Sequence, residues 1–310
     1  MIAEHSPDQV VIPTADGMAT MAGAPFLASI ENRRTPIHVG LMIGRRPSSE
    51  LTRSRRLFNE VKWRSIRRAP FRHVVLMDPR AWSELEAADE LLLGPDPVPA
   101  LGERHREEAR RQLGLDPNSK WVVSAGNQDE RKGVPELIKG FCHIDRPPSH
   151  RLLLIGKCSA AVQSVLSDVS SHPNFDQIEV RDQFVSEEEF VSSIVAADVV
   201  AALYRNTMRP SGIVSRCITW GIPVLARDAG WLRWAVNTFQ AGWRTQPNDL
   251  DALSSALENA LKSSDRFQVS AAAKAFGEFN SESNYQALWR GLVEGTDVPR
   301  PSAELLEAIR

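Results

Sequence analysis

A buried strand and the loop that leaves it are encoded by the stretch WVVSAGNQDERKG, residues 121–133. The run at 121–126 is rich in β-branched residues and ends in glycine, which is typical of a buried strand. The loop that follows has a glycine at each end and carries Arg131 and Lys132. Pro135 suits the first turn of a helix, and we therefore expect a helix over residues 135–142. Strand, cationic loop and helix in this order predict an α/β fold.

The same alternation continues toward the C-terminus. Further strands are predicted at residues 151–156, 177–180, 197–204 and 222–226, and further helices at residues 160–170, 186–196 and 212–220. Ser186 and Glu189 have the spacing of a capping box at the start of one of these helices. Strands that alternate with helices indicate βαβ units, so the five repeats predict a doubly wound domain with a parallel sheet covered on both faces.

Residues 1–98 are predicted to form a second α/β domain. Strands are expected in four apolar runs, at residues 9–14, 36–44, 71–78 and 90–94, and a helix in the Arg-rich segment 53–68. Three prolines and two glycines in the stretch 94–103 favour a linker. A helix is expected over residues 284–294, and the tail that begins at 296–302 is expected to be loose.

Composition and charge narrow the functional classes. The length of 310 residues suggests two domains, with one large domain as the alternative. Hydrophobic residues make up 42% and charged residues 25%, a globular balance that excludes a disordered or fibrous chain. A net charge of −2 argues against a wholly basic nucleic-acid binder. No apolar run approaches the roughly 20 residues that span a bilayer, and the start resembles no signal peptide. Three cysteines without metal-type spacing indicate neither a disulfide framework nor a zinc site. We expect a cytoplasmic protein.

Two loops have the chemistry to bind a phosphate. In the first, at 126–133, glycines allow a tight turn and Lys132 or Arg131 can neutralise an anion beside the following helix. In the second, Ser211 can cap a helix while Gly212 leaves the first-turn N–H groups open to an anion. Solvated turns and plain helix caps use the same residues, so neither loop is specific alone. Both follow strands of one parallel sheet, where a diphosphate can be gripped from two sides.

These residues carry a resemblance to a known family. The matching pieces are EARRQLGL at 108–115, G-x₅-KG at 126–133, LLLIG at 152–156, FVSEEEF at 184–190, AADVVAALY at 196–204 and SG-x₈-GIPVLA at 211–226. In their order and spacing they resemble the donor-binding half of GT-B glycosyltransferases, in particular glycosyltransferase family 4. That family transfers a sugar from a nucleotide-sugar to an acceptor hydroxyl with retention of configuration, often in glycan or polysaccharide biosynthesis. It typically needs no metal, so no cofactor is expected beside the nucleotide-sugar co-substrate.

The resemblance also implies domains and site residues. It implies a shortened, Rossmann-like acceptor-side domain at 1–98, a donor domain at 104–275, and a C-terminal helix with its tail at 281–310 that returns to the N-terminal domain. Lys132, with Arg131, would stabilise charge on the leaving nucleoside diphosphate. The residues expected around the donor are Gly126, Asn127, Gly133, Phe184, Val185, Ser211, Gly212 and Arg216. Asp228 and Gly230 are further candidates for the donor sugar.

Some positions depart from the family pattern. Asn127 stands where the family usually has an arginine, and Arg131 on the same loop is a candidate replacement. Arg209 and Arg216 stand where the family has glutamates that contact the sugar and the ribose. A guanidinium cannot accept a hydrogen bond from a hydroxyl, although it can pair with phosphate. The short N-terminal domain lacks the glycine-rich opening of the family. These departures motivate a second hypothesis, a degenerate binding or scaffold protein without transfer activity. A GT-B epimerase ranks lower, because no paired carboxylates are placed for proton exchange.

The N-terminal domain contains a basic segment at residues 33–72. It holds twelve Lys or Arg residues against Glu50 and Glu60, an excess of +10. Interleaved apolar residues suit an amphipathic helix on an anionic membrane surface, and such a contact would place the protein at the inner membrane face with a glycan or lipid-linked acceptor. The alternative, slightly favoured, is a solvated helix face or the exposed rim of an incomplete domain. No recognised nucleic-acid motif accompanies the charge, so no nucleic-acid partner is expected.

Overall fold

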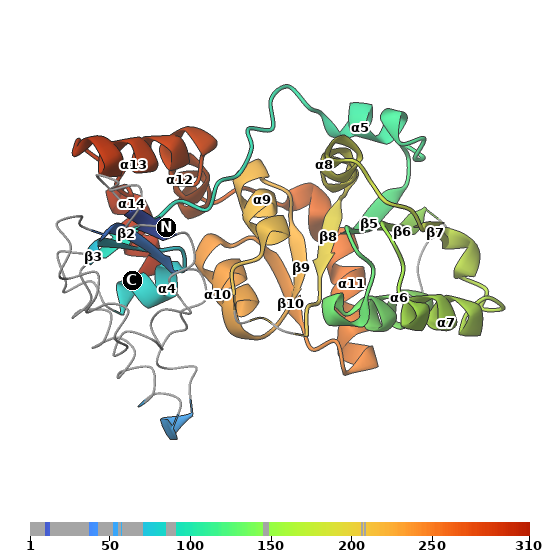
Figure 1. Cartoon of the computed structure of the whole chain (residues 1–310). Coiled ribbons are helices and arrows are strands. Elements are labelled where there is room, and N and C mark those ends of the chain that lie inside the picture. The colour runs from blue at the N-terminus through green and yellow to red at the C-terminus, as the bar shows by residue number, and fades with distance from the viewer. Residues whose placement is uncertain are drawn as a thin grey trace, which may run out of the picture. The chain divides into compact units, whose positions relative to one another are not determined.

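The computed structural model describes residues 10–12, 37–42, 52–54, 57, 71–84, 91–144, 149–205, 207 and 209–310 (Figure 1). The chain divides into two compact units. The first unit comprises Met1–Val98, Met208–Pro210 and Glu278–Arg310, and the second unit comprises Pro99–Thr207 and Ser211–Gly277. Most of the basic segment at 33–72, including most of the predicted Arg-rich helix, lies outside the described residues. Within the described parts of the chain, no helix is long and apolar enough to cross a bilayer.

The second unit is built on a six-stranded sheet. In spatial order its strands are β10 (Gly242–Thr245), β9 (Val224–Arg227), β8 (Val199–Ala202), β5 (Lys120–Ala125), β6 (His150–Ile155) and β7 (Ile178–Arg181). All of these strands pair in parallel. Five of the six were predicted. Strand β10 was not predicted, because the edge strand GWRT has no apolar run that would mark it.

Helices cover this sheet on both faces. They are α5 (Arg106–Gln112), α6 (Val134–His143), α7 (Ala160–Asp168), α8 (Glu187–Ala196), α9 (Gly212–Trp220), α10 (Gly230–Phe239) and α11 (Leu250–Ser263), with short 3-10 turns at Glu130–Lys132 (η3), Phe175–Gln177 (η4) and Ser264–Arg266 (η5). Helix α6 contacts α7 and α11, and α5 contacts α8. Figure 1 shows these two groups on opposite sides of the strands. The predicted capping box is confirmed, since Ser186 and Glu189 exchange both hydrogen bonds at the start of α8.

The core of the second unit explains why its strands read as continuous apolar runs. Val122, Leu152 and Leu154 on the central strands are fully buried, as are Phe141 on α6 and Leu253 on α11. A parallel sheet with helices on both faces has no solvated side, so its strands do not alternate.

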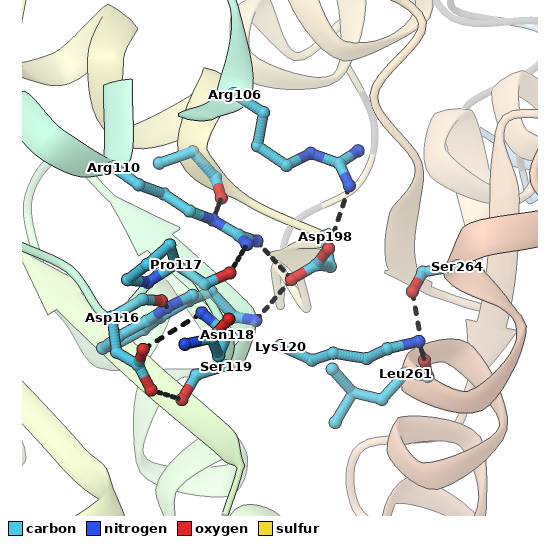
Figure 2. Close-up of polar contacts among 12 residues, drawn as sticks. Arg106, Arg110, Asp116, Pro117, Asn118, Ser119, Lys120, Asp198, Leu261 and Ser264 are labelled. Atoms are coloured by element: carbon cyan, nitrogen blue, oxygen red, sulfur yellow. Dashed lines mark hydrogen bonds and ion pairs between the residues drawn. The ribbon is translucent and has the colours of Figure 1, made fainter. Parts of the chain in front are cut away.

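A buried ion pair fixes the start of the second unit (Figure 2). Asp198, in the turn before β8, accepts hydrogen bonds from Trp121 N at 2.6 Å, Arg110 Nη2 at 2.6 Å and Arg106 Nη1 at 3.0 Å. Arg110 also donates to the carbonyl oxygens of Ala196 and Pro117. One carboxylate thus joins α5 to the first residues of β5.

The first unit combines N-terminal strands with C-terminal helices. Its parallel sheet has the order β1 (Val10–Ile12), β2 (Ile37–Met42), β3 (Phe71–Leu76) and β4 (Leu91–Leu93), all of them predicted. Among its described residues, helices α4 (Pro79–Ser83), α13 (Glu282–Glu294) and α14 (Ala303–Ile309) belong to this unit, and the boundary between the units falls inside α12 (Ala271–Phe279). Leu288 and Leu292 of α13 pack against Val75 of β3.

The end of the chain corrects one prediction. The tail beyond residue 296 is not loose throughout, because residues 303–309 form α14, which is capped by Ser302 and contacts α4. Leu305 and Ile309 are buried. Their spacing of four residues places both on one face of the helix. Two apolar positions are too weak a signal to predict a helix directly after Pro299 and Pro301.

Candidate functional site

The loop that leaves β5 brings a cation back to the end of its own strand. Asp129 caps η3 by accepting a hydrogen bond from Lys132 N at 2.9 Å. Lys132 then returns its Nζ to the carbonyl oxygen of Ala125, at 2.6 Å. Gly126 has φ +81°, and a Cβ there would lie 2.8 Å from Lys132 Nζ. Glycine at this position therefore allows both the left-handed turn and the approach of the ammonium.

The environment of Lys132 disfavours the protonated, charged form of its side chain. Burial, together with the neighbouring Arg131, lowers the pKa of Lys132 to about 8, while Asp129 acts in the opposite direction. The ammonium is still protonated at neutral pH. Arg131 is exposed and lies 3.5 Å from a carboxylate oxygen of Asp129. An anion bound here would meet a partly desolvated cation, which is where charge pairing is strongest.

Two further residues, neither of them predicted for the site, hold the loop. The buried side chain of Gln128 donates to the carbonyl oxygens of Ser124, Gly126 and Ile155, at 2.9, 2.6 and 3.0 Å. Gly156, at the end of β6, approaches so closely that a Cβ there would lie 2.2 Å from Gly126 O. The glycine that ends LLLIG was the available signal for this close approach.

A pocket of about 210 Å³ opens beside this loop. It lies where β5, β6 and β7 end, and its lining consists of Gly126, Asn127, Gly156, Lys157, Phe184, Val185, Ser186, Glu187 and Phe190. Four of the predicted residues, Gly126, Asn127, Phe184 and Val185, thus share one pocket. Phe184 is 90% exposed, which leaves its ring available to a ligand or a partner. Lys157 and Glu187, which were not predicted for the site, add one cation and one anion.

Three other residues predicted for the site, Gly133, Ser211 and Gly212, lie outside the pocket lining. Gly133 has φ +72°, and a Cβ there would lie 2.4 Å from Leu203 O, so this glycine fits η3 and α6 against the end of β8. Ser211 caps α9 by accepting from Val214 N and shares a hydrogen bond with the hydroxyl of Tyr204, whose pKa burial raises to about 12. Gly212 begins α9, is exposed, and has open space around it. None of the three lines the pocket.

Arg216 reaches the pocket from α9 through two of its lining residues. Its Nη2 lies 2.7 Å from Glu187 Oε1. Its guanidinium carbon lies 5.1 Å from the centre of the Phe190 ring and 5.8 Å from that of Trp220. The other arginine singled out in the sequence, Arg209, is exposed.

Asp228, at the end of β9, is engaged by other side chains of the second unit. Its Oδ1 accepts from Arg233 Nε at 2.9 Å and from Arg244 Nη1 at 2.6 Å. The described residues contain no group of three or more His, Cys, Asp or Glu side chains arranged to hold a metal ion.

Comparison with known proteins establishes the fold. Neither a protein-family model nor a curated protein sequence matches the chain. Among solved structures, HepE from Anabaena in complex with UDP is similar with a TM-score of 0.64 and 17% identity, over 94% of this chain and 80% of HepE. Sucrose-phosphate synthase from Thermosynechococcus elongatus gives 0.61 and 19%, over 95% and 73%. WaaG, a glycosyltransferase involved in lipopolysaccharide biosynthesis, gives 0.54 and 16%, over 95% and 78%. The chain therefore has the GT-B fold, as predicted, and its narrower assignment to glycosyltransferase family 4 stays a prediction.

Proposed function

We propose that this GT-B chain is a glycosyltransferase that moves a sugar from a nucleotide-sugar to an acceptor hydroxyl. The observation that carries the proposal is the pocket at the ends of β5–β7, with the Lys132 ammonium beside Gly126 at its edge. Open α/β sheets bind ligands at the carboxyl ends of their strands. Structures of HepE, which has the same fold, contain UDP, UDP with glucose, and UDP-glucose. A nucleoside diphosphate is therefore the first ligand to test.

In the proposed reaction, Lys132 stabilises the charge that develops on the leaving diphosphate. Its ammonium has three donors, and Ala125 O occupies one of them. Arg131, exposed on the same loop, adds a second cation that can take the place of the arginine missing at Asn127. Stabilisation by preorganised cations is a large term in such chemistry. The acceptor hydroxyl would attack from the side that the diphosphate leaves, which retains the anomeric configuration, and the departing phosphate would take its proton.

The donor subsites follow from the positions of the remaining residues. Phe184 and Val185 would lie by the nucleobase, and Ser211 and Gly212, at the start of α9, by the phosphate and the sugar. Gly133 would act indirectly, by seating the loop against Leu203. No metal is required by this scheme.

The proposal extends to the cellular location of the protein and to its acceptor. A cytoplasmic enzyme with a glycan or lipid-linked acceptor is consistent with the involvement of WaaG, which has the same fold, in lipopolysaccharide biosynthesis. We propose that the basic segment at 33–72 contacts an anionic membrane, where a lipid-linked acceptor would be found. Co-sedimentation with anionic and with neutral vesicles distinguishes it from a solvated helix face, since only a membrane contact requires the anionic lipid.

A thermal-shift screen with UDP, GDP, ADP and their sugar conjugates tests the donor site. A ligand that binds the native state raises the unfolding midpoint by mass action. We expect one nucleotide to raise the midpoint, and Lys132→Ala to abolish the shift while leaving the fold intact. Lys139→Ala is the matched control, because Lys139 is an exposed lysine on α6. No shift with any nucleotide would contradict the proposal.

The second candidate is a scaffold protein that binds a nucleotide without transferring a sugar. The pairing of Arg216 with Glu187 at the pocket favours it, because a guanidinium stands where the resemblance places a carboxylate. A nucleotide-sugar that binds in a way that depends on Lys132, but is neither hydrolysed nor transferred to any acceptor, would support the scaffold over the enzyme.

A further inference from the structure

Glu187 and Arg216 form an ion pair at the pocket, and their chemistry bears on which part of a nucleotide the pocket selects. The inference rests on the proposed nucleotide site. Of the residues that line the pocket, Glu187 alone is acidic. It is the first residue of α8, directly after the cap Ser186.

Arg216 fixes the carboxylate of Glu187. The Arg216 side chain is only 20% exposed and lies against the rings of Phe190 and Trp220, whereas the Glu187 side chain is 67% exposed. A guanidinium packed against two rings has little rotamer freedom left to lose, so it holds its partner at low entropic cost. A carboxylate offers about four lone-pair sites. Arg216 takes one oxygen, Oε1, and the group retains acceptor capacity for a ligand.

The rest of the pocket lacks such an acceptor. Phe184, Val185 and Phe190 are apolar, and Lys157 is a donor only. Asn127 and Ser186 are neutral, and Ser186 is committed to its capping box with Glu189.

The neighbouring carboxylates outside the lining are engaged elsewhere. Asp129 accepts from Lys132 N, and Glu130 accepts from the hydroxyl of Ser159. Asp182 accepts from Cys158 N, Gln163 and Lys157, and these hydrogen bonds lower the pKa of Asp182 to about 2. A vicinal diol in the pocket would therefore donate to Glu187 in preference to them.

We propose that Glu187 accepts the hydrogen bonds of the ribose hydroxyls of the nucleotide, and that Arg216 is a positioning residue that orients Glu187. Where the family resemblance places a carboxylate at the position of Arg216 on α9, this pocket has its carboxylate on α8. The pocket thereby selects ribonucleotides over deoxyribonucleotides, and the arginine at 216 is compatible with nucleotide binding.

Calorimetric titration with UDP and with 2′-deoxy-UDP tests the role of Glu187. If the screen selects guanine or adenine, GDP or ADP and its 2′-deoxy form replace the uridine pair. The chain as it stands is expected to bind the ribonucleotide at least about tenfold more tightly, the contribution of a hydrogen bond to a charged group. Glu187→Ala should bring this ratio close to one, because ribonucleotide binding loses the acceptor of the 2′-hydroxyl, whereas the 2′-deoxynucleotide, which keeps only the 3′-hydroxyl, is weakened less. Glu188→Ala, a neighbouring exposed acid in the same helical turn, should keep the ratio.

The outcomes separate the two proposals. If neither the ribonucleotide nor its deoxy form binds, the proposed function and this inference both fail. If the ribonucleotide binds and Glu187→Ala leaves the ratio unchanged, the inference alone is overturned.

A charge reversal tests the role of Arg216. Arg216→Glu places two carboxylates side by side, and we expect it to weaken ribonucleotide binding. The double variant Glu187→Arg with Arg216→Glu restores an ion pair and a carboxylate at the pocket, so the ribose preference should return at least in part. Circular dichroism and the unfolding midpoint report whether each variant is folded. A double variant with no more preference than Arg216→Glu would overturn the positioning role.

Discussion

At the scale of single residues, Lys132 concentrates the chemistry of the site. Its backbone N–H holds the loop to Asp129, and its ammonium returns to the end of β5. Burial lowers its pKa to about 8, so the lysine remains cationic at neutral pH but loses its charge within an accessible range. A bound diphosphate would raise the pKa of Lys132, because a nearby negative charge favours the protonated ammonium.

Nucleotide affinity should depend on pH through Lys132. Above pH 7 the diphosphate is already ionised, since its second pKa is about 6. Lys132 is protonated below its pKa of about 8 and neutral above it. We therefore expect the affinity for UDP to fall as pH rises through about 8, with no such fall in Lys132→Ala. Titrations between pH 7 and about 9.5 measure this, and a flat profile in the unmodified chain would argue against a contact between Lys132 and the diphosphate.

At the scale of elements, the site depends on two strands whose ends nearly touch. Gly156 at the end of β6 and Gly126 at the end of β5 approach within a distance that excludes a side chain. Gln128 bridges the same two strand ends through Gly126 O and Ile155 O. The pocket is thus shaped by backbone contact, which is a rigid foundation for a binding loop.

Gly156→Ala should destabilise the second unit and weaken nucleotide binding. The new Cβ would clash with Gly126 O in a backbone conformation of φ +129°, and strain plus overpacking cost about 3 kcal/mol. Gly114→Ala is the control, since φ is +63° there and a Cβ meets open space. It should cost only about 1–2 kcal/mol. Denaturant unfolding measures the loss of unfolding free energy in each variant. Equal losses would show that the backbone at Gly126 and Gly156 moves apart easily to admit a side chain.

Asp198→Ala should be among the most destabilising changes in the second unit. It would leave Arg110, whose side chain is 8% exposed, without its carboxylate, and breaking a buried pair costs about 3–5 kcal/mol. The exposed pair of Asp265 with Lys120 gives the comparison, because Asp265→Asn should cost less than about 1 kcal/mol. Similar unfolding free energies for the two variants would contradict the role assigned to Asp198.

At the scale of the whole molecule, the N-terminal strands of the first unit share a core with the last helices of the chain. Leu288 is 1% exposed and packs with Val75 of β3. The first unit therefore depends on residues more than 200 positions away in sequence.

Leu288→Ala should loosen the first unit selectively. Removing a buried leucine costs about 2–5 kcal/mol, whereas Val293→Ala, at a position 49% exposed, should change stability by less than about 0.5 kcal/mol. Hydrogen exchange should accelerate in β3 of the Leu288 variant and stay slow in β6. Unchanged protection of β3 would exclude the packing described for α13.

The predictability of the molecule followed the strength of its local signals. Long apolar runs such as LLLIG marked buried strands, and Ser186 with Glu189 marked a helix start. The edge strand β10 was missed because GWRT has no apolar run, although its partner β9 is nearby in the sequence. The short helix α14 was missed because it packs on α4, which is distant in sequence. Glu187 was missed for a similar reason. An acid in the first turn of a helix is ordinary by itself, and only its contact with Arg216 on another helix gives it a part in the candidate site.

The most direct test of the proposed function compares UDP with uridine in calorimetric titrations of the unmodified chain and of Lys132→Ala. The difference between the two ligands isolates the diphosphate. We expect UDP to bind at least about tenfold more tightly than uridine to the unmodified chain, and this advantage to disappear in Lys132→Ala while uridine binding persists. Equal affinities for UDP and uridine, or an advantage that survives the substitution, would contradict a diphosphate site at Lys132.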